Sequence, residues 1–371
     1  MRSTFAVLAG LGAVCLVCGC EEEKKPTETA PSATPAASAA TAPTPPPKPS
    51  PAEVVSKAIK ADVAAWNAHD AAKVAALYEP TGKLIEPGLP DASGRDAIQA
   101  NAKENFTAYP DFKVAVTRTF VKGNMAVLEW VVTGKNDGPS MGQKPTGRQM
   151  GIAGASVSTF DDDGLIKEEH RYFDLPTLQS QLDPKAKAGT FRAPMTLPTG
   201  ATEEHVAKGT PDEAKTVDQG NAILKADESK DDAKLMATVT DDYVWEDYSS
   251  PAAIKTANLK AEIAKYSKAF PDFTLPTTTT FAVDGYFVAE MSFVGTQKGP
   301  MGPIKASNKP VKVQMVDIQL LKDGKATREW SYMNSAQLLI QIGAMPPIAA
   351  APAASASAAA TTAPAAPAKP K

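Results

Sequence analysis

The sequence predicts an α+β fold that occurs twice in tandem, because one pattern of turns and apolar runs appears in two stretches of the chain. Tyr109–Phe112 (Tyr-Pro-Asp-Phe) recurs as Phe270–Phe273 (Phe-Pro-Asp-Phe). Asp163–Tyr172 matches Asp323–Tyr332 at nearly the same spacing. Agreement in order, spacing and turn residues indicates an internal duplication. In the first copy, helical periodicity comes first and strand-like runs follow, which is typical of helices packed on one face of a sheet.

The elements of the first copy are predicted from periodicity. Apolar residues at helical spacing, including Val55, Ile59 and Trp66, predict a helix over residues 51–78. A second helix is expected over residues 94–106, with Ser93 as its N-cap. Four consecutive antiparallel strands are then expected over residues 112–120, 125–133, 148–160 and 165–173, with hairpin turns at Gly123-Asn124 and Asp163-Gly164.

The N-terminus has the pattern of an export signal. Arg2 supplies a positive charge, and residues 5–17 form an uncharged, mostly apolar run that is too short to span a bilayer comfortably. Val17–Cys20 (Val-Cys-Gly-Cys) resembles the lipobox of bacterial lipoproteins. That resemblance implies a signal peptide over residues 1–19, lipidation of Cys20, and an exported protein anchored to the cell membrane on its periplasmic side or at the cell surface. The alternative is an ordinary secretory signal that is cleaved nearby.

The other segments are assigned by composition. Residues 20–51 and 346–371 are rich in Ala and Pro and are expected to be a disordered linker and tail, while residues 183–211 are expected to link the two copies. The cysteines are Cys15, Cys18 and Cys20, so a chain cleaved before Cys20 cannot form an intramolecular disulfide. A net charge of -3 with mixed charges argues against a nucleic-acid-binding surface.

Several motifs of the first copy occur in an order that resembles a known family. They are Asn67–Asp70, Gly94–Asp96, Tyr109–Phe112, Pro145–Arg148 and the closing segment Asp163–Asp174. Together they resemble the SnoaL-like polyketide cyclase and ester cyclase family of the NTF2-like superfamily. The resemblance covers residues 52–182 and, more weakly, residues 212–345. It implies two tandem cones, each a curved antiparallel sheet wrapped on helices around an apolar pocket, with no metal or cofactor.

The resemblance places a catalytic acid/base at Asp174, since cyclases of this family use a carboxylate in the closing segment. An Asp in an apolar cone would have a raised pKa, as acid/base work near neutral pH requires. The alternative is a structural role, because Asp174 precedes Leu175-Pro176 and a short helix and is therefore a good N-cap. The second copy has Asn334 at the matching position, which can cap a helix but cannot transfer a proton.

Five further residues are candidate pocket-lining groups, each with a structural alternative. Side chains alternate along a strand, so His170, Tyr172 and Asp174 share one face. The second copy has Trp330 in place of His170 and keeps the tyrosine as Tyr332. Glu129 lies within an otherwise apolar strand and is either a pocket carboxylate or part of a salt bridge. Together with Asn334, these are the predicted pocket residues.

Two functions remain open. The chain is either a non-catalytic envelope protein that binds a small hydrophobic ligand or acts as a scaffold, or a cofactor-independent cyclase, isomerase or hydrolase of a small hydrophobic carbonyl compound. His69, His170 and His205 show no metal-ligand spacing, so no metal is expected. Because family members commonly pair through their sheets, we expect the two copies to form an internal pseudo-dimer. Apolar residues on both faces of strand 125–132 agree with this.

Overall fold

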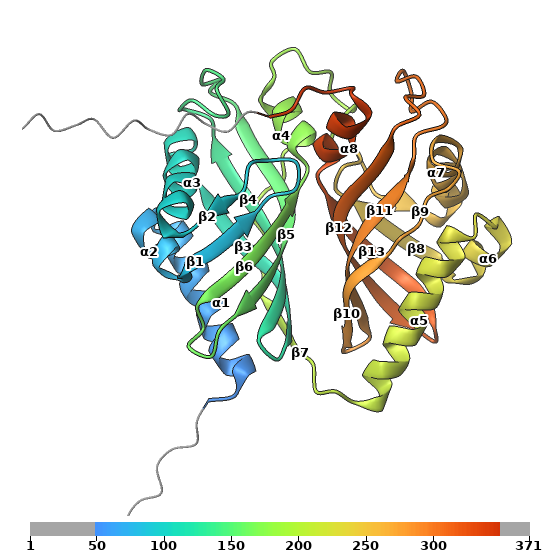
Figure 1. Ribbon diagram of the computed structural model, residues 1–371, viewed down its shortest axis with the longest axis horizontal. Coiled ribbons are helices and arrows are strands. Elements are labelled where there is room, and N and C mark those ends of the chain that lie inside the picture. Colours follow the sequence, from blue (N-terminus) through green and yellow to red (C-terminus); the bar gives the residue numbers. More distant parts are fainter. Residues whose placement is uncertain (1–48, 349–371) are drawn as a thin grey trace, which may run out of the picture. The chain divides into compact units, whose positions relative to one another are not determined.

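The computed structural model describes residues 49–348, which contain both copies of the repeat (Figure 1). The predicted signal peptide, Cys20, most of the first linker and most of the tail lie outside the described residues. No helix within residues 49–348 is both long enough and apolar enough to cross a membrane.

Each copy has helices packed on a sheet, as the sequence predicts. The elements of the first copy are α1 (Pro51–Asn67), α2 (Ala71–Ala76), β1 (Tyr78–Ile85), β2 (Ala92–Ser93), α3 (Arg95–Ala108), β3 (Lys113–Lys122), β4 (Met125–Lys135), β5 (Gln149–Phe160), β6 (Ile166–Phe173) and α4 (Leu175–Leu182). The strand β7 (Glu203–Val206) follows, and the sheet order is β2-β1-β6-β5-β4-β3-β7.

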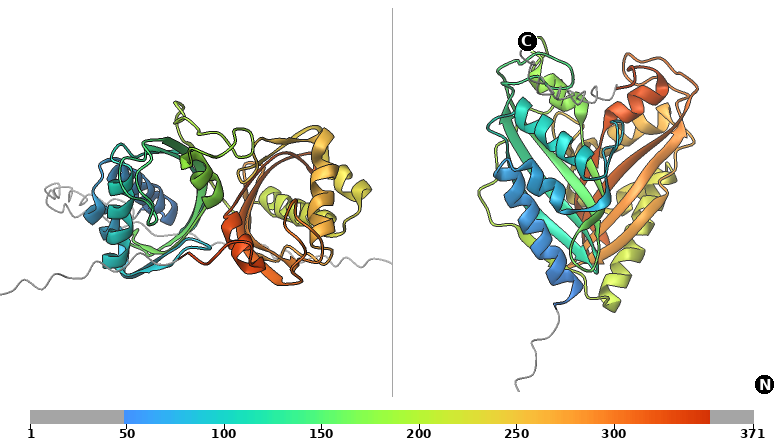
Figure 2. Two further views of the ribbon diagram at one scale, coloured as in Figure 1. Left: turned by 90° about the horizontal axis from the view of Figure 1, so that it is seen from above. Right: turned by 60° about the vertical axis from the view of Figure 1, so that its left-hand side comes forward.

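The second copy repeats this order. Its elements are α5 (Pro211–Glu228), α6 (Asp232–Ala237), β8 (Val239–Asp247), β9 (Ile254–Lys255), α7 (Thr256–Ala269), β10 (Thr277–Val283), β11 (Tyr286–Thr296), β12 (Pro310–Lys322), β13 (Lys325–Met333) and α8 (Ser335–Ile342). The sheet order is β10-β11-β12-β13-β8-β9. In both copies the sheet curves around its helices (Figure 2).

Local chemistry explains where the first helix of each copy begins. Ser50 caps α1 and forms a capping box with Glu53, and Pro51 occupies the first turn. Thr210 and Glu213 do the same for α5. The matching signals at matching positions show that the duplication extends to the helix caps.

Three sequence-based expectations are corrected. The helix predicted over residues 51–78 ends at Asn67, because His69 has a left-handed φ of 56° and Asp70 caps a separate helix, α2. Tyr78 then begins β1, which pairs in parallel with β6, so the sheet is mixed and not wholly antiparallel. The N-cap of α3 is Gly94 instead of Ser93, and it makes no side-chain cap.

The linker between the copies also contains regular structure. Within residues 183–211, Glu203–Val206 forms β7, which pairs in parallel with the edge strand β3. The ring of His205 stacks on Phe120, with ring centroids 5.2 Å apart, and Nδ1 lies 2.9 Å from Asp284 Oδ2. The linker therefore covers an edge of the first sheet that would otherwise expose unpaired backbone groups.

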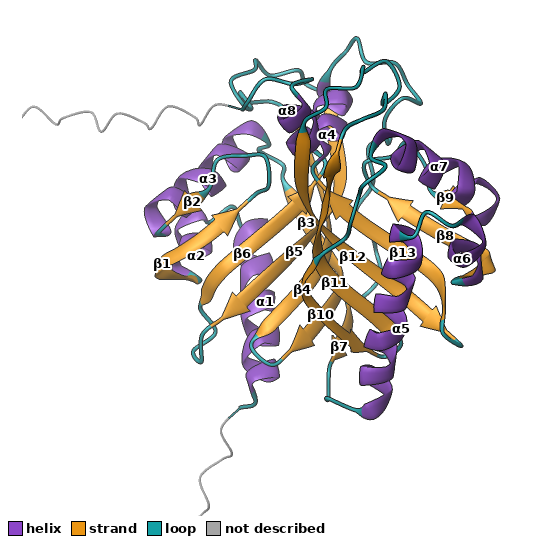
Figure 3. Ribbon diagram, turned by 45° about the vertical axis from the view of Figure 1, so that its right-hand side comes forward, coloured by secondary structure: helices purple, strands orange, loops and turns teal. Residues whose placement is uncertain are grey.

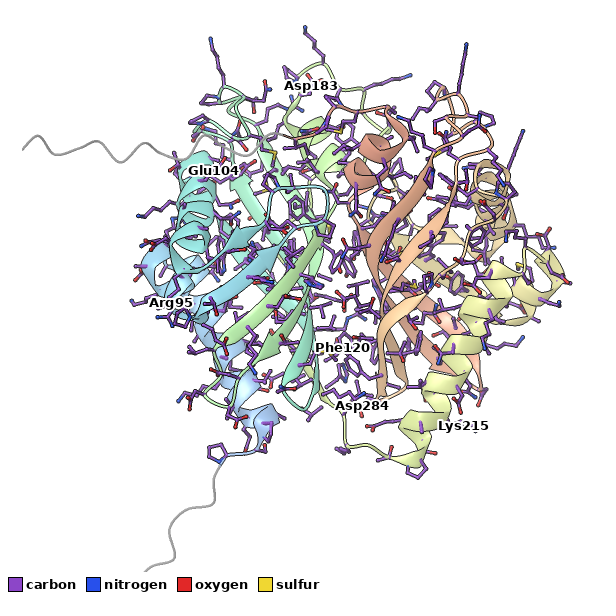
Figure 4. The ribbon with its side chains drawn as sticks, in the orientation of Figure 1. Arg95, Glu104, Phe120, Asp183, Lys215 and Asp284 are labelled. Carbon is purple, nitrogen blue, oxygen red and sulfur yellow. The ribbon has the colours of Figure 1, made fainter. Side chains whose placement is uncertain are left out.

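The apolar residues form three clusters. Two lie inside the copies, between each sheet and its helices. The third joins the outer faces of the two sheets and includes Phe120, Val127 and Val131 from the first copy with Val288 and Ile318 from the second. Figures 3 and 4 show the two sheets facing each other, with Phe120 labelled between them in Figure 4. Strand β4 is therefore buried on both faces, which explains its continuous apolar run.

Candidate functional site

The first copy encloses a cavity of about 780 Å³ between its sheet and its helices. This volume falls within the range of typical small-molecule sites. Its walls are largely apolar and include Ile59, Trp66, Leu128, Trp130, Ile152 and Phe173. Glu104 of α3, labelled in Figure 4, also lines it.

One wall of this cavity carries a buried charged cluster centred on Glu169 of β6. Glu169 accepts hydrogen bonds from the Tyr78 hydroxyl and from Ser156 Oγ, the latter at 2.7 Å. Arg171 Nε donates to Glu169 Oε1 at 3.2 Å, and Arg171 Nη1 lies 3.3 Å from Glu86 Oε1. Burial raises the pKa of Glu169, but the charge of Arg171 and these hydrogen bonds outweigh it and hold the pKa below its usual value.

A second carboxyl group lines the cavity from the helical side. Asp62 lies on α1, and its Oδ1 is buried with no hydrogen-bond partner among the described residues. Burial, followed by the negative charge of Glu169, raises the pKa of Asp62 to about 7. The Glu169 oxygens already have donors, whereas Asp62 retains an oxygen that can interact with a bound molecule. Perturbed carboxyls of this kind are frequent at functional sites.

The end of the second copy and the first residues of the predicted tail supply part of the wall of this cavity. Met345, Pro346, Pro347 and Ile348 follow α8 and line the first copy's cavity. Met345 and Ile348 pack against the first copy's core. Figure 1 shows this segment running from α8 toward the first copy. The cavity is therefore built from both copies.

The second copy has a much smaller cavity of about 100 Å³ at the corresponding place. It is lined by Tyr243, Asp317, Gln319, Glu329 and Ser331, among others. Among the residues that the structure describes, no group of His, Cys, Asp and Glu side chains is arranged to hold a metal ion.

The family model described as SnoaL-like polyketide cyclase matches residues 56–182 and 221–342. The chain belongs to this family. Each match covers nearly all of one copy, so the duplication inferred from the sequence is a tandem pair of SnoaL-like domains. No curated protein matches the chain significantly.

Solved structures that are similar to this chain include three from Streptomyces. AclR from Streptomyces galilaeus is 21% identical, with a TM-score of 0.34 over 36% of this chain and 84% of AclR. TsrD from Streptomyces laurentii is 24% identical, with a TM-score of 0.32 over 37% of this chain and 100% of TsrD. IdmH from Streptomyces antibioticus is 24% identical, with a TM-score of 0.31 over 34% of this chain and 96% of IdmH.

Asp174, predicted as the acid/base of the first SnoaL-like domain, does not line its large cavity. It caps α4 by accepting from Thr177 N at 2.9 Å, and its other oxygen accepts from Ser335 N at 2.9 Å in the second copy. Asn334 is arranged in the same way: its Oδ1 accepts from Ala336 N at 3.1 Å and from Leu175 N at 3.2 Å. Asp174 and Asn334 therefore each cap two helices, the helix that follows in their own copy and the matching helix of the other copy.

The predicted pocket residues also lie between the two copies and not in the large cavity. Tyr172 donates to Glu290 at 2.7 Å, and Tyr332 donates to Glu129 at 2.5 Å, so the two tyrosines make reciprocal contacts. His170 Nδ1 lies 2.5 Å from Glu290, and a hydrogen bond to Glu290 raises the pKa of His170.

The remaining predicted pocket residue, Trp330, takes part in a cation–π contact. The Arg118 guanidinium lies 3.6 Å from the centre of the Trp330 ring and forms an ion pair with Glu129. Apart from Asn334, which caps helices, the residues predicted to line a pocket instead make contacts between the two sheets.

Strand alternation explains this difference. On β6, Glu169, Arg171 and Phe173 point into the cavity, whereas His170 and Tyr172 point to the other sheet. The sequence correctly places residues 170, 172 and 174 on one face, but that face is the one buried against the second copy. Asp62, Glu86, Ser156, Glu169 and Arg171 were not predicted as site residues. Glu169 and Arg171 could have been found as charged residues on the opposite face of the same strand.

Proposed function

We propose that the first SnoaL-like domain binds a small, mostly apolar molecule that carries a hydroxyl or carbonyl group. The observation that supports this most strongly is the cavity of about 780 Å³ that contains a buried Asp62 oxygen without a partner among the described residues. A protonated carboxyl can donate one hydrogen bond and accept others, so Asp62 suits a ligand oxygen of either kind. The apolar walls suit the rest of such a ligand.

The raised pKa of Asp62 lowers the stability of the unliganded protein at neutral pH. A carboxyl whose folded-state pKa lies above its unfolded value contributes stability that is fully present below about pH 4 and is lost as the pH rises toward the folded pKa. For Asp62 that folded pKa is about 7. Such a residue destabilises the unliganded protein at neutral pH, which is typical of functional positions.

Replacing Asp62 with Asn is therefore expected to stabilise the protein at pH 8 by about 1–3 kcal/mol, since one pKa unit corresponds to about 1.4 kcal/mol. Near pH 4 the same substitution is expected to have little effect. Urea unfolding at the two pH values measures both. Equal stabilisation at both pH values would show that Asp62 does not titrate as described.

The ligand can be sought directly by native mass spectrometry of the Cys20→Ala chain after exposure to a lipid-soluble extract of the source cells. We expect one discrete small-molecule adduct. Ala97→Trp, which fills the cavity from α3, should remove it. Asn258→Trp is the matched control, because Asn258 is the exposed residue at the corresponding position of α7. An adduct that survives Ala97→Trp would place the ligand elsewhere.

Acid/base catalysis in the same cavity is the second candidate, and the pKa of about 7 for Asp62 favours it. General acids and bases work best when their pKa lies near the operating pH. In this function Asp62 would transfer a proton to or from the ligand oxygen, without a cofactor. A change of adduct mass over time, abolished in Asp62→Asn, would distinguish an enzyme from a binding protein.

We also propose that the protein is an exported lipoprotein of the cell envelope, anchored by a lipid on Cys20. The support is the charge, apolar run and cysteine of the N-terminal sequence. In detergent phase separation, the wild-type protein should enter the detergent phase and Cys20→Ala should stay in the aqueous phase. A wild-type protein that stays in the aqueous phase would contradict the anchor.

The contacts between the sheets support a third proposal, that the two copies form an internal pseudo-dimer in solution. The reciprocal Tyr172–Glu290 and Tyr332–Glu129 hydrogen bonds relate the copies by an approximate two-fold exchange. Such self-complementary contacts are typical of two-fold dimers. The outer faces of the two sheets are then buried against each other within one chain. The chain should therefore be a monomer in analytical sedimentation. Self-association through either sheet would contradict the proposal.

A further inference from the structure

The small cavity of the second copy differs in charge from the large one. Strand pairing places Ser331 where the first copy has Arg171, and Asp317 where it has Ser156. Glu329 corresponds to Glu169. The second copy has thus lost the buried cation and gained a carboxyl group, and none of the described residues lining its cavity is Lys or Arg.

Three oxygens of this cavity have no hydrogen-bond donor among the described residues, and one of them is Oδ1 of Asp227. Asp317, 1% exposed, accepts from Gln319 Nε2 at 2.8 Å through Oδ2, which leaves Oδ1 without a partner. Gln319, 2% exposed, has no partner for Oε1. The neighbouring Glu329 already accepts from the Tyr243 hydroxyl at 2.6 Å. An amide oxygen cannot be protonated in this pH range, so Gln319 requires an external donor, and leaving it without one is costly.

The remaining walls suit the apolar part of a cation. Trp245, Tyr266, Phe273 and Phe293 line the cavity, and aromatic faces attract positive charge. The volume of about 100 Å³ is on the order of three water molecules, enough for an amine with a short carbon chain. Burial raises the pKa of Asp317 to about 7, and a bound cation would stabilise its ionised form.

We propose that the second copy binds a small primary organic amine in its protonated form. The ammonium group donates to Asp317 Oδ1 and Gln319 Oε1, and its short carbon chain lies against the aromatic wall. This site is separate from the ligand cavity of the first copy. Its occupant is a cation because the cavity brings together the carboxyl groups of Asp227, Asp317 and Glu329, and none of the described residues that line it is a buried cation.

Calorimetric titration of the full chain with n-propylammonium chloride tests the proposal, with n-propanol as a neutral probe of similar shape and potassium chloride as the salt control. We expect saturable binding of n-propylammonium only. Asp317→Asn should weaken it at least tenfold. This variant should still fold, because the amide has nearly the same shape as the carboxyl and keeps an oxygen that can accept the hydrogen bond from Gln319. Ser331→Arg, which restores the cation of the first copy, should abolish binding.

Three results would overturn the proposal. The first is no saturable binding of n-propylammonium, which would show that water satisfies the free oxygens of Asp317 and Gln319. The second is equal binding of n-propanol, which would show that charge plays no part. The third is binding that is lost in Asp62→Asn but kept in Asp317→Asn, which would place the amine in the first copy's cavity. The first two results leave the proposed ligand of the first copy untouched, whereas the third would also add an amine to what that cavity binds.

Discussion

Replacing Arg171 with Met is expected to lower the free energy of unfolding by about 3–5 kcal/mol at pH 7, the usual cost of removing one partner of a buried ion pair. The Arg171 side chain is 12% exposed and lies between Glu169 and Glu86. Its removal leaves two carboxyl groups in an apolar cavity without their counter-ion. The Trp66 ring, 5.1 Å from the Arg171 guanidinium, also loses a cation–π contact.

The loss of stability in Arg171→Met should depend on pH, and the direction of this dependence identifies its cause. In the wild type the pKa of Glu169 is lowered, so this group contributes stability above the unfolded value of about 4.3 and loses it as the pH falls. Without Arg171, burial raises the pKa, and stability is lost as the pH rises. The deficit of Arg171→Met should therefore be small near pH 4 and full at pH 8. Urea unfolding at the two pH values measures this loss of stability. Lys73→Met, which removes an exposed ion pair with Asp70, is the control. A loss that does not change with pH would contradict this explanation.

Arg118→Met is expected to cost about 3–5 kcal/mol for a similar reason at the contact between the copies. Its partner Glu129 is 1% exposed and would keep only the hydrogen bond from Tyr332. The cation–π contact with Trp330 would also be lost. The double variant Arg118→Met/Glu129→Leu should lose less stability than Arg118→Met alone, because no unpaired charge remains. Equal losses in a urea-unfolding cycle would show that the charge of Glu129 is not the cause.

The duplication, the two α+β domains and their family could be predicted from the sequence because they depend on order and spacing. Which face of β6 lines the cavity could not be predicted from the sequence. Alternation separates Glu169 and Arg171 from His170 and Tyr172, but it does not say which pair faces the helices when both faces of a sheet are buried. A strand assigned to the wrong face exchanges all its site residues with its packing residues.

The other errors come from contacts between residues distant in sequence. Tyr78 continues a helical pattern, yet it begins a strand because β1 pairs in parallel with β6. The strand β7 forms within a linker whose composition favours a loop, because β3 offers an unpaired edge. Asp62 could not be recognised as a site residue, since its raised pKa depends first on its burial in the folded protein and then on the charge of Glu169, which lies far along the chain.

The central claim, that the ligand meets the inner face of the first domain and not the face that carries Asp174, is tested most directly by comparing two variants. Native mass spectra of Asp62→Asn and Asp174→Asn would be recorded with the same cell extract and compared with the parent protein. The structure predicts that Asp62→Asn weakens the small-molecule adduct and that Asp174→Asn retains it, because only Asp62 lines the cavity. An adduct that is lost in Asp174→Asn and unchanged in Asp62→Asn would contradict the account.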